Sequence, residues 1–328
     1  MMGFNENPQS WLFDEIPNDD RVILFFNPEK KKRKELFYKV VYCILGPETQ
    51  LNYAKLRSIY MSSLNQFNIQ YTTTYEGIND NQRKKVIEDM TRTLCKIRYD
   101  FYPDSKPPND REKKLFCAIL RITLSLHYEK NPEINLFKYI QSIIELILPI
   151  YHIVWCSFDY KETYAIEALT KYLFKKFMKK THQIDIIPGS ISFQEHFSEF
   201  ELYIKKNERT IYNIFVSNNI QFLIPFKWYS LIFTQEFNFD DVIEVWKYLF
   251  NQNIDNFSEN LKNICIHILK KISKEISKRK DDKQFIMQSI QDIKHIGIQD
   301  IIHEISQSDK SKDKGILKNA FTFLSSRF

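Results

Sequence analysis

"FLIPFKWYSLIFTQEFNFDDVIEVWKYLF", residues 222–250, combines many aromatic residues with helical spacing. Its first half is an aromatic-rich segment around Trp228 that runs on to Glu236. The N-F-D-D sequence that follows has the amide and acidic residues typical of a helix start. Val242 and Trp246 then stand four residues apart, as on the apolar face of an amphipathic helix. The stretch therefore predicts a helical hairpin in a core rich in aromatic side chains.

Helical periodicity also dominates the rest of the chain from "KELFYKVVYCIL", residues 34–45, onward, and alternating strand patterns are hard to find. We therefore predict an all-α fold. Loops are expected where Pro, Gly, Asp and Ser cluster, at residues 45–50, 102–112, 186–190 and 307–315. No repeat of fixed period is visible, so a solenoid is not predicted.

The composition predicts a soluble, globular chain, and its length predicts one large domain with two lobes or two small domains. With 43% hydrophobic and 15% aromatic residues, the chain has too much apolar material for a disordered protein. Its 328 residues exceed the length at which one core usually stops growing. The most apolar segment, residues 134–156, contains Lys138 and Glu145, so we interpret it as a core helix and expect no membrane span.

The apolar run ends near "SFDYKE", residues 157–162, where ordinary amphipathic periodicity resumes, and we place the boundary between the lobes there. The predicted organisation is an N-terminal extension, a first lobe, a second lobe and a C-terminal tail, over residues 1–20, 21–160, 161–305 and 306–328.

Several kinds of site are excluded by missing motifs. The six glycines are too far apart for the phosphate-binding loops GxGxxG and GxxxxGK[ST], and neither GxSxG nor HExxH occurs. The five cysteines form no CxxC pair, which argues against a disulfide framework and a zinc site and favours an intracellular compartment. The formal charge of +6 is too small a bias to indicate nucleic acid. His127 and His152 lie in apolar segments without a matched nucleophile, so we interpret both as core histidines.

Two basic stretches allow more than one interpretation. "EKKKRKE", residues 29–35, fits a nuclear address or a contact with anionic lipid, but a solvated helix start is favoured. Residues 257–280 combine an apolar stripe with a lysine-rich face, which suits a membrane surface or, as we favour, packing on the helix's own domain. The stripe comprises Leu261, Ile264, Cys265, Ile268, Leu269, Ile272 and Ile276.

Two further short stretches contain candidate functional residues. In "VIEDMTRTL", residues 86–94, Asp89 and Arg92 stand three apart, so on a helix they share a face and can pair. In "KYIQSIIELILP", residues 138–149, Gln141 lies just before a strongly apolar helix. Taken singly, the first is an ordinary surface ion pair and the second a polar group at a helix start or a satisfied amide.

In content and chain order, the three stretches resemble the TBC-domain proteins that activate the GTPase activity of Rab GTPases. The pattern RW…L..rEF…d…iWD.lf of that family resembles residues 222–250. Its IxxDxxRT signature is matched, with one conservative change, by Val86, Asp89, Arg92 and Thr93. Its YxQG signature is matched by Tyr139 and Gln141, with Ser142 at the glycine, and Glu145 and Pro149 match family positions further on.

The resemblance covers roughly residues 20–305 and implies a two-lobed helical TBC fold. It also implies that Arg92 and Gln141 enter the active site of a Rab GTPase as two catalytic fingers. Supporting roles follow by resemblance for Asp89, Thr93, Tyr139 and Glu145, with Asp89 holding Arg92 and Tyr139 setting the loop of Gln141. We interpret the nearby Arg98 as a surface charge.

The resemblance implies a GTPase activator, which acts on the GTP bound to its partner. A stand-alone enzyme is the less favoured interpretation. This chain would bind no cofactor or metal of its own, since the Rab partner supplies GTP and Mg²⁺. We expect no nucleic-acid partner and a cytoplasmic location, with peripheral association with endomembranes or a place at the cilium or cytoskeleton as alternatives.

Four differences from the family keep a second function open. Ser142 and Lys138 stand where glycines are usual, Cys95 follows "RTL" in place of proline, and Lys247 replaces an aspartate. The alternative is a catalytically weak or inactive TBC fold that serves as a scaffold in a membrane-traffic, ciliary or cytoskeletal assembly.

Overall fold

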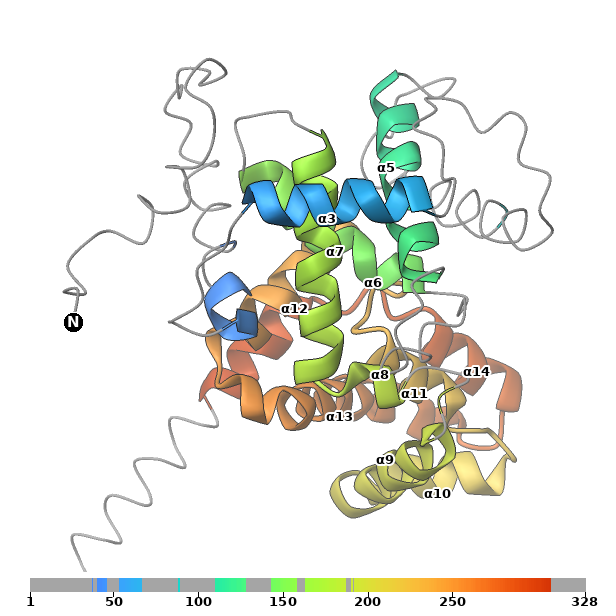
Figure 1. Cartoon of the computed structure of the whole chain (residues 1–328). Coiled ribbons are helices and arrows are strands. Elements are labelled where there is room, and N and C mark those ends of the chain that lie inside the picture. Colours follow the sequence, from blue (N-terminus) through green and yellow to red (C-terminus); the bar gives the residue numbers. More distant parts are fainter. Residues whose placement is uncertain are drawn as a thin grey trace, which may run out of the picture. The chain divides into compact units, whose positions relative to one another are not determined.

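The computed structural model describes residues 37, 40–45, 53–66, 88, 110–127, 143–157, 163–186, 190 and 192–307. Within these ranges the regular elements are all helices, which confirms the all-α prediction (Figure 1). The chain divides into two compact units, Met1–Phe193 and Gln194–Phe328, which are described in turn.

The first unit is built around one long helix, α7, which contacts four other described helices. In Figure 1, α3 runs across α7, while α5 and α6 pack on α7 and on each other. The described helices of this unit are a helical segment over residues 40–45, α3 (Tyr53–Gln66), α5 (Asp110–His127), α6 (Ile143–Ser157), α7 (Thr163–Lys180) and the short α8 (Gln183–Ile186).

The position of α7 follows from its pattern of apolar residues. Leu169, Leu173 and Phe177 recur every four residues and are completely buried, so one face of the helix belongs to the core. Lys179 and Lys180 stand exposed in the last turn, where positive charge favours the negative end of the helix dipole.

The boundary between the units differs from the predicted lobe boundary near residues 157–162. Because α7 packs on α3, α5 and α6, it belongs with the first unit, whereas the sequence analysis assigns residues 161–193 to the second lobe. Residues 157–162 look like a boundary in the sequence, but the buried face of α7 belongs to the core of the first unit.

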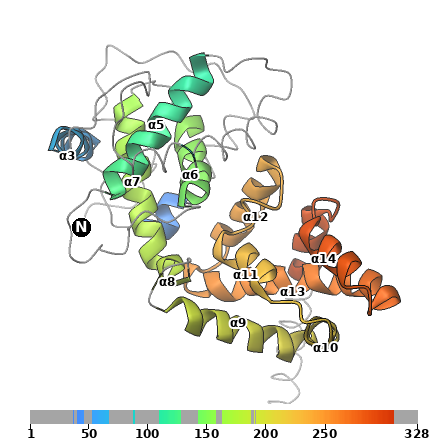
Figure 2. The ribbon, with the colours of Figure 1, turned by 90° about the vertical axis from the view of Figure 1, so that its right-hand side faces the viewer.

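The second unit is organised around α13. This helix contacts α10, α11, α12 and α14, as Figure 2 shows from the side. Its elements are α9 (Phe193–Asn207), α10 (Arg209–Ser217), α11 (Leu223–Ser230), α12 (Phe239–Asn251), η3 (Ile254–Asn256), α13 (Phe257–Ile276), η4 (Ser277–Arg279) and α14 (Lys283–Gln291), followed by a helix over residues 298–307.

The apolar stripe of α13 is buried inside the second unit. All seven of its predicted members have exposed fractions of 2% or less. The interpretation that this stripe packs on its own domain is therefore confirmed, and its apolar face is not available to a membrane.

The two helices predicted from residues 222–250 are present, as α11 and α12, and each packs on α13. Trp228 and Trp246 are completely buried, and the side chain of Asn238 caps α12 by accepting a hydrogen bond from the Asp241 N–H at 3.0 Å. Between the helices, Ile232 and Phe233 take positive φ angles of 50° and 60°, which are uncommon for bulky side chains.

Candidate functional site

Most of the predicted site residues lie outside the described part of the chain. These are Asp89, Arg92, Thr93, Tyr139 and Gln141. Glu145 is described: it lies in the first turn of α6 with a partly buried side chain. The predicted roles of all six residues remain predictions.

The helix that follows Gln141 has the character expected of a rigid support. It begins at Ile143, and its residues Ile144, Ile147 and Ile150 are completely buried. Pro149 stands inside this helix. A helix buried on several faces holds its first turn in place, and therefore limits where the preceding residues can lie.

Next to α6, the first unit contains a buried polar cluster, which we define as Tyr60, Arg121, Glu167 and Lys171. Its centre is a two-contact ion pair between α5 and α7. The Arg121 Nε lies 2.9 Å from one Glu167 carboxylate oxygen, and an outer guanidinium nitrogen lies 2.5 Å from the other. The side chains of Arg121 and Glu167 are 8% and 0% exposed. This planar arrangement is the strongest geometry available to such a pair.

A third helix joins the cluster through Tyr60 of α3. The Tyr60 hydroxyl donates a hydrogen bond of 2.8 Å to Glu167. Burial, together with the charge and hydrogen bond of Glu167, raises the pKa of Tyr60 well above its ordinary value, so the phenol keeps its proton. The hydroxyl therefore remains a donor, and α3 stays attached to α7.

Lys171, on α7, adds a second positive charge to the cluster. Its Nζ donates to the Ser125 carbonyl of α5 at 3.2 Å and lies 5.9 Å from the centre of the Tyr60 ring. Arg121 likewise lies 5.5 Å from the centre of the Tyr164 ring. Every charge in the cluster therefore has polar or aromatic partners.

The Tyr60 phenol and the Arg121 guanidinium keep their protons near neutral pH, because the pKa of each is raised. Burial alone would lower the pKa of Arg121, but its hydrogen bond to Glu167 and the charge of Glu167 raise the pKa above the ordinary value. Burial first, and the charge of Glu167 second, raise the pKa of Tyr151 on α6. Groups that do not titrate are suited to positioning, and this cluster joins α3, α5 and α7 beside α6.

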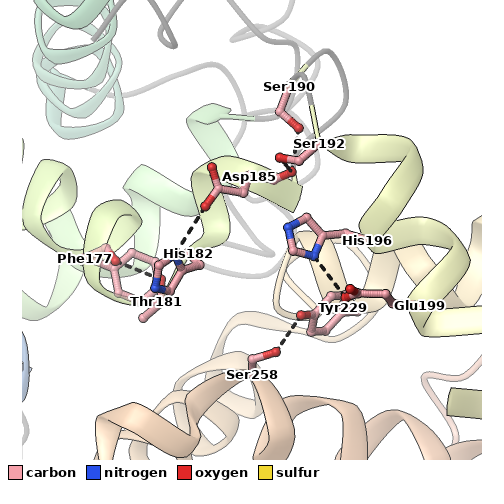
Figure 3. A network of polar contacts seen from close by, with 10 residues as sticks. All are labelled: Phe177, Thr181, His182, Asp185, Ser190, Ser192, His196, Glu199, Tyr229 and Ser258. Carbon is pink, nitrogen blue, oxygen red and sulfur yellow. Dashed lines mark hydrogen bonds and ion pairs between the residues drawn. The ribbon is translucent and has the colours of Figure 1, made fainter. Parts of the chain in front are cut away.

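Figure 3 shows a second group of polar contacts, which includes His, Asp and Ser side chains. In a hydrolase, a His of such a group would contact a Ser hydroxyl and act as its base. At the end of α7, the His182 ring faces the Asp185 carboxylate at 3.3 Å. Ser190 and Ser192 both donate to the Asp185 backbone carbonyl, at 2.6 and 3.2 Å. His182 therefore does not activate either hydroxyl as a nucleophile.

In the second unit, Figure 3 shows His196 beside Glu199 at 3.4 Å and a hydrogen bond of 2.7 Å between the hydroxyls of Tyr229 and Ser258. Burial comes first among the causes that raise the pKa of Tyr229 to about 12. The Tyr229–Ser258 contact joins α11 to α13 and is structural.

Two general absences hold for the described part of the chain. It contains no group of three or more His, Cys, Asp or Glu side chains placed to hold a metal ion. None of its helices combines the length and the apolar character needed to cross a membrane.

The sequence analysis missed Arg121, Glu167 and Lys171. A signal for Arg121 was available, because it interrupts the apolar run CAILRITL, residues 117–124. An arginine in a buried run needs an acidic partner. Sequence spacing alone does not identify that partner, since Glu167 is 46 residues away.

Comparisons with known proteins all find TBC or Rab-GAP domains. The family model described as the Rab-GTPase-TBC domain matches residues 33–277. The TBC domain-containing protein C1952.17c of Schizosaccharomyces pombe is 25% identical over 181 residues, which are 48% of this chain and 28% of that protein. The match thus spans little more than a quarter of that relative.

A solved structure has the same fold. It is the crystal structure of the Ypt/Rab-GAP domain of Gyp1p, with a TM-score of 0.55 and 16% sequence identity. The similarity covers 90% of this chain and 95% of that domain. It confirms the predicted helical fold and, at this identity, the fold alone.

Proposed function

The chain belongs to the Rab-GTPase-TBC domain family, and from this premise we propose that it accelerates GTP hydrolysis by a Rab-family small GTPase. One observation carries the proposal. The family match spans residues 33–277, a range that includes both short signatures, and in them we propose Arg92 and Gln141 as the two fingers.

Arg92 is proposed to stabilise charge in the transition state. Transfer of the terminal phosphoryl group to water increases negative charge on oxygens around the phosphorus, and a positive group with several donors offsets it. Guanidinium keeps its charge at neutral pH and presents its donors in a planar fork. Asp89 and Thr93, which share its signature, are proposed to hold Arg92 in position.

Gln141 is proposed to align the attacking water, because a primary amide donates and accepts hydrogen bonds at once. Tyr139 and Glu145 flank it and are proposed to support its loop. The buried start of α6, two residues after Gln141, supports this assignment because a finger needs a rigid base.

The proposed reaction is completed by the partner. The GTPase would supply GTP and Mg²⁺, while this chain contributes side chains in trans and binds no cofactor. We place this activity in the cytoplasm, at the surface of endomembranes.

A second candidate function is a scaffold that retains the TBC fold without strong catalysis, in a membrane-traffic, ciliary or cytoskeletal assembly. Ser142 and Lys138 favour it, because the backbone beside Gln141 lacks the conformational freedom of glycine. The two functions differ in their response to a transition-state mimic. An activator binds its GTPase more tightly with GDP and aluminium fluoride than with GDP alone, whereas a scaffold shows no such preference.

The experiment that tests the proposal is single-turnover GTP hydrolysis by a panel of purified Rab GTPases. Wild-type protein is compared with Arg92→Ala, Gln141→Ala and the matched control Arg98→Ala. Acceleration of a subset of the panel, lost in the first two variants and kept in the third, is expected. If no GTPase is accelerated at high protein concentration, the scaffold replaces the activator.

A further inference from the structure

The exposed side of α13 carries a row of lysines. Lys270, Lys274 and Lys278 follow one another at intervals of four residues, so they lie along one side of the helix and its η4 extension. All three side chains are exposed, and Lys280 is exposed in the turn that follows. We call these four residues the lysine face.

The neighbouring charges do not neutralise this face. Residues 270–283 contain seven basic and three acidic residues, a net charge of +4 in a chain whose total is +6. The ion pairs recorded in this segment use other cations: Lys271 lies 3.1 Å from Glu304, and Arg279 lies 2.5 Å from Asp282.

The lysine face also has a stability cost. Like charges four residues apart on a helix repel one another. The helix dipole favours positive charge only within the last turn, so it accounts for the lysines nearest the end of α13 and not for Lys270. Among the described residues, no recorded ion pair offsets this repulsion, and an anionic surface outside the chain would relieve it.

The turn after α13 is held firmly in place. The Asn218 amide donates to the Lys280 carbonyl at 2.8 Å, and the Lys283 Nζ donates to the Asn219 carbonyl at 3.3 Å. The Asp282 carboxylate caps α14 through the Phe285 N–H at 2.9 Å. Residues 277–283 line an open hollow of about 620 Å³. The lysine face therefore ends beside an open hollow whose lining has four basic and two acidic residues.

We propose that the lysine face is a docking surface for an anionic lipid bilayer. Lysines on the surface of a helix attract acidic headgroups as point charges and need no matching shape. Protein interfaces are enriched in aromatic and Arg anchors and depleted in Lys, and the lysine face offers no apolar anchor because the apolar side of α13 lies in the core. The charge pattern thus fits a diffuse layer of phosphate and carboxylate groups. This inference is independent of the proposed function, because it can be measured without a GTPase.

The test is flotation of the full chain with phosphatidylcholine vesicles that contain or lack phosphatidylserine. The wild-type protein is expected to bind only the anionic vesicles and to be released by salt. Replacing Lys270, Lys274 and Lys278 together by Gln should weaken binding roughly 5-fold for each lysine. The matched control neutralises three exposed lysines elsewhere, Lys179, Lys180 and Lys206, and should keep wild-type binding.

Two further measurements make the outcome decisive. The triple variant Lys270→Arg, Lys274→Arg and Lys278→Arg should bind as the wild type does, which would show that charge is the cause and that the surface tolerates substitution. Polyglutamate serves as an acidic peptide probe. The proposal is overturned if wild-type protein ignores anionic vesicles, if the control triple loses binding equally, or if the lysine face is needed for polyglutamate alone.

Discussion

Arg121 and Glu167, 46 residues apart in the sequence, form a buried ion pair with two contacts, of 2.9 and 2.5 Å. The pair joins α5 to α7, and Tyr60 adds α3 through its hydrogen bond to the same carboxylate. Polar groups thus hold together a unit whose remaining contacts are largely apolar. Such pairs contribute less to net stability than to the choice of one arrangement, and removing one partner is costly.

We predict that Arg121→Met lowers the free energy of unfolding by about 3–5 kcal/mol, because Glu167 is left as a buried charge without its partner. Urea denaturation monitored by circular dichroism measures the loss. The matched control is Lys247→Met, which breaks the half-exposed pair between Lys247 and Glu244 and should cost under about 1 kcal/mol.

The double variant Arg121→Met/Glu167→Met distinguishes a buried charge from a cavity. Most of the lost stability should return, since two apolar side chains of similar volume replace both charges. A remaining deficit of about 1–3 kcal/mol is expected from the Tyr60 hydroxyl, which loses its acceptor. If the double variant is as unstable as the single one, the unpaired buried charge of Glu167 is not the cause of the lost stability.

Tyr60→Phe should cost about 1.5–3 kcal/mol, because it removes a hydrogen bond of 2.8 Å to a charged carboxylate and leaves the ring in place. The same denaturation experiment measures it. In the Glu167→Gln background the cost should shrink, since the acceptor is no longer charged. Equal costs in both backgrounds would place the effect in packing of the ring instead.

The helical fold could be predicted from the sequence because the patterns that indicate helices, apolar periodicity and capping residues, are local. Periodic apolar residues predict the buried faces of α7 and α13, and the N-F-D-D sequence predicts the start of α12, capped by Asn238. The order of the three signatures predicted the family, which the match over residues 33–277 confirms.

The remaining features depend on contacts distant in sequence. The partner of Arg121 is set by how α5 packs on α7, and no spacing rule reports that packing. The division into compact units at residues 193/194 likewise follows from the packing of α7 on α3, α5 and α6, which no local sequence signal reports. The fingers remain predictions from motif resemblance, since Arg92 and Gln141 lie outside the described residues.

Lys247 replaces the aspartate usual in the family, and the structure gives a reason to keep it. It forms an ion pair with Glu244, one turn earlier on α12. Lys247→Asp should therefore lower the free energy of unfolding by about 0.5–1 kcal/mol, since attraction becomes repulsion between like charges. Lys247→Gln should cost about half as much. A more stable Asp variant would show that an unrecognised cation is close to this position.

Asp282 should make stability depend on acid pH. The Phe285 N–H first, and Arg279 second, lower the pKa of its carboxyl in the folded chain below the unfolded value near 3.9. The ionised form thus favours folding, and its contribution is present above about pH 4 and lost as pH falls through the lower folded pKa. Asp282→Asn should lower the thermal midpoint at neutral pH, and the difference should vanish in strong acid. Asp281→Asn, an exposed neighbour, is the control.

Arg92→Lys is the sharpest test of the proposed arginine finger. A finger of this kind is worth about 10³ to 10⁵ in rate, and its effect depends on several donors held in a plane. Lysine keeps the charge but offers only a flexible point donor. Single-turnover hydrolysis on a responsive Rab GTPase should therefore fall nearly as far with Arg92→Lys as with Arg92→Ala, while binding of the GDP-bound partner stays near that of the wild type. If Arg92→Lys retains most of the activity, charge alone is sufficient and the planar fork is not used.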